Sequence, residues 1–250
     1  MKFNVETVAS DEQVSARTEL ARMVRVSAIP DAELAKNLTL FLPWQETMRV
    51  LFIAELYRQI IEVPGVIIEF GTRWGRNLSL LSTLRTTLEP LNHNRKIVGF
   101  DTFRGLLPKS EKDGHSEYAA AGSLAVTLDW KAQLEKILSI HERGTPYPHI
   151  KKHEVIEGDA VERLTEYLGR HPETIIALAY FDMDLYEPTK KCLERILDGH
   201  VTKGTVIAFD EVNHSTFPGE TIALREVVGL RNVALRKSWL NPLCGYYIVE

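Results

Sequence analysis

The sequence predicts a single α/β domain with a seven-stranded, mostly parallel sheet and helices on both faces. The chain has 250 residues, of which 44% are hydrophobic, which is enough to bury one sizeable core. From about residue 66 onward, short apolar runs typical of strands alternate with segments of helical period. Such alternation favours a parallel sheet, because right-handed crossovers place the connecting helices on its faces.

The strands and helices can be assigned in chain order. Strands are predicted at about 66–70, 96–101, 153–157, 175–181, 205–210, 233–237 and 245–249. Helices are predicted between them, at about 75–88, 129–141, 160–170, 186–197 and 219–229. The last two strands are joined by residues 238–245, which leave no room for a crossover helix. The final strand should therefore run antiparallel to its neighbour.

Two further helices are predicted before the sheet begins. Residues 11–27 form a weakly amphipathic, peripheral helix, and a more apolar helix follows Pro43. We treat residues 1–62 as an N-terminal helical extension and residues 63–250 as the main domain. Exposed apolar side chains such as Trp44 predict that the extension builds a homo-oligomer interface or closes over the site.

Composition excludes several classes of protein. Lys and Arg total 30 against 34 Asp and Glu, so no basic field attracts nucleic acid. Cys192 and Cys244 lie far apart, which argues against a disulfide framework or a zinc site and fits a reducing cytoplasm. The first residues lack the apolar core of a signal peptide, and no apolar run approaches the roughly 20 residues that span a membrane. We expect a soluble, cytoplasmic protein without a membrane partner.

Residues 104–128 interrupt the compact pattern. They contain charged residues, Gly and Ala with no helical or strand periodicity, and they form a longer insertion than ordinary strand-to-helix loops. A long loop at the carboxyl end of a strand is usually functional or disordered. We interpret this segment as a mobile lid over the site.

Four acids follow two of the predicted strands. Asp182 and Asp184 come after the strand at 175–181, and Asp210 and Glu211 end the strand at 205–210. Carboxylates gathered at a sheet edge lose hydration and repel one another, at a cost of several kcal/mol per ion unless they are paired. A cation should sit among them, and an oxygen-only ligand set suits Mg²⁺, with Ca²⁺ or Mn²⁺ as alternatives.

Other roles for two of these acids stay open. Asp182 and Asp184 face the same side if the extended backbone continues, and Asp182 is the better ligand because it lies nearer the strand. Asp184 can instead lie behind the ligands or cap the helix that begins near Tyr186. Glu211 can instead form an ion pair with Arg225 or Lys203.

A glycine-rich turn follows the first predicted strand. Glu69 ends this strand, and Gly71 and Gly75 occupy the turn that opens the next helix. Glycine permits the turn dihedrals and lets a ligand approach the backbone. The spacing differs from the dinucleotide fingerprint, which makes an NAD-linked oxidoreductase a poorer fit.

Two more acids end the next strands. Asp101 stands where a doubly wound sheet offers a carboxylate to ribose hydroxyls, and Asp159, followed by Ala160, is placed to meet an adenine edge. Each acid can instead serve the fold alone, since Asp101 can cap a turn and Asp159 can cap the following helix. Three acids at successive strand ends together favour a ligand site, because open α/β sheets bind ligands at their carboxyl edge.

These residues resemble the macrocin O-methyltransferase-like branch of class I S-adenosylmethionine-dependent methyltransferases, which act on sugar hydroxyls in antibiotic and glycan pathways. The resemblance spans most of the chain from about residue 63. Segment 69–75 (EFGTRWG) resembles the first motif of S-adenosylmethionine-dependent methyltransferases in general. The segments distinctive of this branch are 100–106 (FDTFRGL), 181–187 (FDMDLYE), 204–211 (GTVIAFDE) and 217–219 (FPG). Family members usually carry two aspartates where this chain has Asp210-Glu211; glutamate keeps the charge but adds a methylene. The stretch from Lys203 to Asp210 also resembles catechol-type, Mg²⁺-dependent O-methyltransferases.

The resemblance implies a Rossmann-like class I methyltransferase fold, a function and a set of site residues. S-adenosylmethionine should bind at the ends of the first strands, and both resemblances imply a divalent cation held by Asp182, Asp210 and Glu211. The acceptor should be a hydroxyl of a sugar or nucleotide-linked sugar. A catechol or phenol acceptor, or a non-catalytic cofactor-binding subunit, is the alternative. The expected cofactor residues are Glu69, Gly71, Thr72, Gly75, Asn77, Asp101, Thr102, Asp159 and Ala160.

Methyl transfer to a weakly acidic hydroxyl needs a proton acceptor. A cation that coordinates the hydroxyl lowers its pKa and positions it. Asp182 is the first choice for the acceptor, Asp184 the second and His214 the third, although a lone loop histidine is more often surface decoration. Tyr186 and, with weaker support, His115 in the predicted lid are candidate substrate-binding residues; Tyr186 can instead belong to the core.

Overall fold

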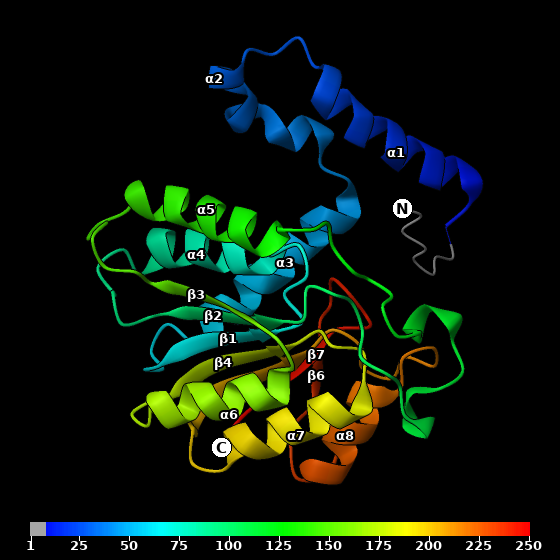
Figure 1. Cartoon of the computed structure of the whole chain (residues 1–250), viewed down its shortest axis with the longest axis vertical. Helices are drawn as coiled ribbons and strands as arrows, with labels where there is room; N and C mark the ends of the chain where they lie inside the picture. Colours follow the sequence, from blue (N-terminus) through cyan, green and yellow to red (C-terminus); the bar gives the residue numbers. More distant parts are fainter. Residues whose placement is uncertain (1–8) are drawn as a thin grey trace.

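A computed structural model describes residues 9–250 and confirms the predicted α/β architecture (Figure 1). The helical elements are α1 (Asp11–Val26), α2 (Asp31–Leu34), η1 (Ala35–Phe41), α3 (Trp44–Gln59), α4 (Arg76–Leu88), η2 (Glu111–Asp113), η3 (Glu117–Ala119), α5 (Trp130–Arg143), α6 (Ala160–Arg170), α7 (Tyr186–Leu197) and α8 (Gly219–Val227). The strands are β1 (Val66–Phe70), β2 (Ile97–Asp101), β3 (His153–Glu157), β4 (Ile176–Phe181), β5 (Val201–Phe209), β6 (Arg236–Lys237) and β7 (Gly245–Ile248).

Within the described residues the sheet has seven strands in the order β3-β2-β1-β4-β5-β7-β6. Strands β1 to β5 pair in parallel, whereas β7 runs antiparallel to both β5 and β6. The antiparallel direction predicted for the final strand is confirmed. The order reverses between β1 and β4, and ligands of open α/β sheets bind at such a switch point.

Helices cover the sheet in two layers (Figure 1). Helices α3, α4 and α5 lie on one face, and α6, α7 and α8 lie on the other. Each layer buries its own hydrophobic cluster, because residues of a strand interior point alternately to the two faces. The buried strands β1 and β4 are apolar on both faces apart from Glu69, as expected for central parallel strands.

A row of stacked phenylalanines crosses the sheet beneath its carboxyl edge. The ring centroids are 5.4 Å apart for Phe70 and Phe100, 4.8 Å for Phe70 and Phe181, and 5.2 Å for Phe181 and Phe209. These residues are direct partners in the strand register. The row therefore fixes the ends of four strands relative to one another, immediately below the residues that follow them.

The N-terminal helices fall into two groups. Helix α3 buries Phe52, Ile53, Leu56 and Tyr57 and packs against α4. Helix α1, α2 and η1 contain no buried residue and stand away from the sheet (Figure 1). Expectations about the first eight residues, including the missing signal peptide, lie outside the described part of the chain. Across residues 9–250, no helix has the length and apolar content needed to cross a membrane.

Two strands depart from their predicted bounds. Strand β5 begins at Val201 rather than near residue 205, because Gly204, which reads as a turn residue, continues the strand by donating to the Val249 carbonyl at 2.8 Å. The strand predicted at 233–237 is reduced to Arg236–Lys237 at the sheet edge. Within the described residues β6 is the outermost strand and pairs with β7 alone.

Candidate active site

A cavity opens at the carboxyl edge of the sheet, at the switch point between β1 and β4. It is lined by the residues that end β1, β2 and β4 and by the turn that opens α6. Leu106, Leu107 and Leu124, from the segment predicted to form a lid, cover one side. Of the predicted cofactor residues, the cavity lining includes Glu69, Gly71, Thr72, Asn77, Asp101, Thr102 and Ala160.

Gly71 brings the first turn into contact with the end of β4. Its φ is 88°, and a Cβ at this position would lie 1.7 Å from the carbonyl oxygen of Asp182. The amide of Asp182 donates to the Phe70 carbonyl at 2.9 Å, so the two backbones run side by side. Only glycine permits this approach, which places Asp182 next to the predicted cofactor turn.

Glu69 and Asn77 form a buried polar pair on the cavity wall. Burial raises the pKa of Glu69 to about 8, against the opposing effect of a hydrogen bond with Asn77. Glu69 Oε2 and Asn77 Oδ1 have no hydrogen-bond partner within the described residues. Buried polar atoms without partners are costly, so these two atoms are suited to receive polar groups of a ligand.

Asp101 and Asp159 both accept hydrogen bonds from backbone amides of the turns beside them. The Asp101 carboxylate accepts the backbone amides of Arg73 at 2.6 Å and Phe103 at 2.5 Å, which fixes the turn after β2 at the cavity wall. Asp159 caps α6 by accepting the amide of Val161 at 2.8 Å, and its side chain is not part of the cavity lining. A carboxylate oxygen can accept more than one hydrogen bond, so Asp101 retains acceptor capacity toward the cavity.

Three acids gather beside the cavity. Asp182, Asp184 and Glu211 each offer a carboxylate oxygen, and these oxygens all lie within 4.8 Å of one another. Burial, together with neighbouring negative charges, raises the pKa of Asp182 and of Glu211 well above their usual range. Burial also raises the pKa of Asp184 to about 6. An oxygen-only group of this kind fits a hard divalent cation.

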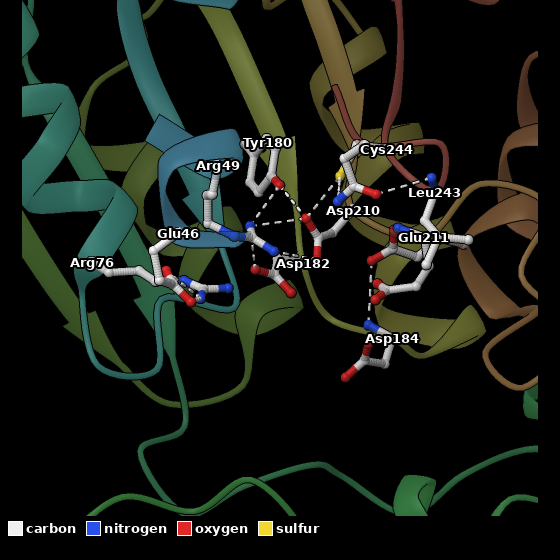
Figure 2. Close-up of polar contacts among 12 residues, drawn as sticks. Glu46, Arg49, Arg76, Tyr180, Asp182, Asp184, Asp210, Glu211, Leu243 and Cys244 are labelled. Carbon is white, nitrogen blue, oxygen red and sulfur yellow. Dashed lines mark hydrogen bonds and ion pairs between the residues drawn. The ribbon is translucent and has the colours of Figure 1, made fainter. Parts of the chain in front are cut away.

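Asp210, the remaining predicted ligand, is turned toward Arg49 of α3 (Figure 2). The Arg49 guanidinium donates to both oxygens of Asp210, at 3.0 and 3.1 Å, and its Nη1 lies 4.0 Å from Asp182 Oδ2. The hydroxyl of Tyr180 and the thiol of Cys244 also donate to Asp210 Oδ1. Burial opposes ionisation, but Arg49 outweighs it and lowers the pKa of Asp210.

Glu220, at the start of α8, holds the two acidic loops together. Its Oε1 accepts the amides of Met183 at 3.0 Å and Asp184 at 3.2 Å, and its Oε2 accepts the amide of Glu211 at 3.2 Å. The side chain is fully buried. One carboxylate thus sets the relative position of the loops that follow β4 and β5.

The other candidate residues lie outside the cavity lining. His214 is half-buried and stacks on Phe217 at 5.6 Å between ring centroids. His115 is exposed. Tyr186 is buried, and its hydroxyl donates to Glu226 at 2.6 Å, away from the cavity.

Sequence reasoning missed two residues that organise the site. Arg49 is 161 positions from its partner Asp210, so no local pattern signals the pairing. Glu220 directly follows the 217–219 segment (FPG) that the resemblance singled out, and this proximity was the available signal. Glu211 makes neither of the ion pairs considered for it within the described residues, and it lies with Asp182 and Asp184 instead.

Comparison with solved structures identifies the family. No family model and no curated protein sequence matched the chain. The crystal structure of CalS11, described as a calicheamicin methyltransferase, superposes with a TM-score of 0.94 at 40% identity, covering 99% of this chain and 96% of that one. The chain belongs to the macrocin O-methyltransferase-like family of class I methyltransferases.

Other solved structures fit this assignment to the macrocin O-methyltransferase-like family. The apo structure of CalS11, described as a TDP-rhamnose 3'-O-methyltransferase of calicheamicin biosynthesis, has a TM-score of 0.85 at 39% identity, covering 97% of this chain and 96% of that one. The O-methyltransferase NovP shares the fold, with a TM-score of 0.57 at 18% identity over 80% of this chain and 79% of that one.

As a member of the macrocin O-methyltransferase-like family, the protein is an S-adenosylmethionine-dependent O-methyltransferase. The Rossmann-like fold that the resemblance implied is confirmed. Asp182 and Asp184 share the cavity with seven of the nine predicted cofactor residues.

Proposed function

We propose that this enzyme transfers the methyl group of S-adenosylmethionine to a hydroxyl of a nucleoside-diphosphate deoxysugar in natural-product biosynthesis. One observation carries the proposal: the chain matches CalS11, described as a TDP-rhamnose 3'-O-methyltransferase, over 97% of its own length and 96% of that chain. The acidic group beside the cofactor turn supports it, because a sugar hydroxyl is a weak acid and needs help to lose its proton.

The cofactor residues fall into three parts of the cavity wall. S-adenosylmethionine supplies an electrophilic methyl group, and the chain must hold the donor in line with the acceptor oxygen. Glu69 and Asn77 offer buried polar atoms at the first turn, Asp101 offers a carboxylate at the end of β2, and Ala160 offers backbone at the start of α6. These positions follow the carboxyl edge where open α/β sheets bind nucleosides.

A divalent cation, Mg²⁺ above all, fits the acidic group. Bound there, it would lower the pKa of a coordinated hydroxyl and fix its position. Asp182, Asp184 and Glu211 would hold it in the arrangement described, whereas Asp210 keeps its two oxygens on Arg49. Asp210 is thus the predicted ligand that lies outside this group of three carboxylates and is paired with a cation of the protein.

Asp182 is the best-placed proton acceptor. It lines the cavity, and Gly71 brings it against the cofactor turn. A proton acceptor must lie within reach of the hydroxyl it deprotonates, and this position satisfies that requirement. Asp184 also lines the cavity and is the second candidate, while His214 lies outside the lining.

The test is methyl transfer by purified enzyme to TDP-rhamnose and, in parallel, to catechol. We expect transfer to TDP-rhamnose that requires Mg²⁺ and stops with a chelator. Asp182→Asn should lower kcat by about 10²- to 10⁴-fold, the usual range for loss of a general base. Asp198→Asn, an exposed aspartate at the end of α7, is the matched control and should leave kcat unchanged.

Three results would contradict parts of the proposal. Transfer to catechol with none to the nucleotide sugar would replace the acceptor class. Turnover that a chelator leaves unchanged would remove the cation. Full activity in Asp182→Asn would show that this carboxylate neither accepts the proton nor holds the site.

A further inference from the structure

The segment 104–128, predicted to be a mobile lid, makes a buried polar contact with the body of the protein through one acid. Asp113, the last residue of η2, is 1% exposed although its side chain is a carboxyl group. Its Oδ1 accepts the backbone amide of Tyr186 at 2.5 Å. Its Oδ2 accepts the amide of Ser110 at 2.6 Å and the hydroxyl of Ser110 at 2.8 Å.

Asp113 caps the N-terminus of α7, which has no capping side chain at its own N-cap position. The N-cap residue of α7 is Leu185, whose side chain cannot accept a hydrogen bond. The first amides of a helix lack partners within the helix and require an acceptor. Here the acceptor for the first helical amide comes from a residue 73 positions earlier in the chain.

The capped amide belongs to the loop that carries two of the acidic residues. Asp182, Met183, Asp184 and Leu185 connect β4 to α7. Asp184 has a φ of 62°, a left-handed conformation that is unfavourable for residues other than glycine unless surrounding contacts hold it. Glu220 binds this loop at its centre, and Asp113 binds it where the helix begins.

Gly219 makes the approach of Asp113 possible. A Cβ at this position would lie 2.6 Å from Asp113 Oδ1, 2.6 Å from the Tyr186 amide nitrogen and 2.8 Å from the Asp184 carbonyl oxygen. No side chain fits between these three atoms. This close contact gives a physical reason for the glycine in the 217–219 segment, for which the sequence offered none.

A second, exposed contact joins the same elements. Lys112 Nζ donates to Glu226 at 2.6 Å and to the Tyr186 hydroxyl at 2.9 Å, and it lies 4.1 Å from the centre of the Tyr186 ring. Exposed ion pairs are screened by solvent and contribute little. Of these two polar contacts, the buried one of Asp113 is therefore the stronger.

We propose that Asp113 is a positioning residue, which sets the loop carrying Asp182 and Asp184 in its reactive geometry only when segment 104–128 is closed over the cavity. The inference rests on the proposed function, because it takes Asp182 and Asp184 as residues of the reaction. When the segment closes, it covers the cavity, and the Asp113 carboxylate at the same time fixes the end of the loop that carries Asp182 and Asp184.

The decisive variant is Asp113→Asn, which keeps the shape of the side chain. An amide has one oxygen and one NH₂ group, so it cannot accept from Tyr186 and Ser110 at once, and one backbone donor must face a donor. Glu111→Gln, in the same turn of η2 but exposed, is the matched control. Ser110→Ala removes one donor to Asp113 without leaving a buried charge unpaired, and it serves if Asp113→Asn does not fold.

Two measurements test the proposal: one reports the docking of segment 104–128, and the other reports the reactive geometry of the loop that carries Asp182 and Asp184. The first is the rate of trypsin cleavage after Lys109 and Lys112, which reports whether the segment stays docked. The second is kcat and KM for TDP-rhamnose, with the affinity for S-adenosylhomocysteine measured alongside. Asp113→Asn should raise the cleavage rate and lower kcat, each by about tenfold or more, the scale expected for an unsatisfied buried donor. Affinity for S-adenosylhomocysteine should fall less than kcat, because only one side of the cavity is lined by the segment, through Leu106, Leu107 and Leu124.

The outcomes separate this inference from the proposed function. Faster cleavage and lower kcat in Asp113→Asn but not in Glu111→Gln support it, and Ser110→Ala should show a smaller change in the same direction. Unchanged cleavage and unchanged kcat in Asp113→Asn overturn it and leave the proposed function standing. If the wild type transfers no methyl group to the nucleotide sugar, the proposed function fails instead, and the cleavage rates alone decide whether Asp113 holds the segment.

Discussion

At the scale of single residues, buried carboxyl groups outnumber the cations that face them. Burial raises the pKa of Glu69, Asp182, Glu211 and Glu220, whereas Asp210 ionises readily because Arg49 pairs with it. The carboxyl edge therefore favours partners that bring positive charge or hydrogen-bond donors. A sulfonium donor and a divalent cation both meet that need.

Glu69 makes a testable contribution to the pH dependence of stability. Its pKa is raised from an ordinary value of 4.5 to about 8, so the folded state binds this proton more tightly than the unfolded state does. The resulting stabilisation is complete below about pH 4.5 and is lost as the pH rises toward 8. Glu69→Gln stays neutral, so its free energy of unfolding relative to wild type should rise over this window by up to about 4–5 kcal/mol.

Urea unfolding of both proteins at pH 5 and pH 8, without ligand, measures the effect. Glu62→Gln, an exposed glutamate just before β1, is the control and should follow the wild type. If the difference between Glu69→Gln and wild type is the same at both pH values, Glu69 does not titrate as described.

How far the sequence predicts single residues depends on how local their partners are. The acids at the strand ends could be placed, because parallel strands bring their carboxyl ends to one edge. The capping role considered for Asp159 follows from the next three residues and is confirmed. Arg49 could not be paired with Asp210, since the contact depends on how α3 docks against the sheet.

At the scale of elements, one ion pair ties α3 to the end of β5. Both side chains are largely buried, with 16% of Arg49 and 10% of Asp210 exposed. Removing one partner of a buried pair leaves the other charge without compensation, which costs about 3–5 kcal/mol. Arg49→Met should therefore lower the free energy of unfolding by about that amount, and Arg49→Lys by less, because lysine keeps the charge but loses the two-pronged contact.

Chemical unfolding at neutral pH compares these variants with Arg58→Met, an exposed arginine on the same helix. Equal losses in Arg49→Met and Arg58→Met would show that α3 is held by its apolar contacts alone.

Periodicity predicted the long elements well and the short ones poorly. Helices α6 and α7 and strand β1 have the predicted bounds, because each shows a sustained apolar period between clear turn residues. The short α2 and η1 were not predicted, and the strand predicted at 233–237 is only two residues long, since these elements depend on neighbouring chain rather than on their own pattern. The docking of 104–128 was equally hidden, because it depends on Asp113 meeting a helix distant in sequence.

At the scale of the whole molecule, α1, α2 and η1 form an arm without a core of its own. The arm buries none of its residues, and it exposes Val14, Met23, Val26, Leu38 and Leu40. An isolated helix of this length is marginal in water. A partner surface is needed to stabilise it, and we predict that a second copy of the chain supplies this surface.

Static light scattering tests the oligomer directly. We expect a mass of two or more chains for the wild type and a shift toward the monomer for Leu40→Asp, which places a charge on the arm at a side chain 65% exposed. Leu91→Asp, a leucine 66% exposed in the loop after α4, is the control and should keep the wild-type mass. A monomeric wild type would refute the prediction.

The four stacked phenylalanine rings below the carboxyl edge have a consequence for engineering. Since each ring stacks on the next from Phe100 to Phe209, we expect a change in any one of them to disturb the packing of all four strand ends. Attempts to redirect the enzyme toward another hydroxyl should therefore leave this row intact. They should instead vary the peripheral loops, where backbone shifts do not disturb the alignment of the strands.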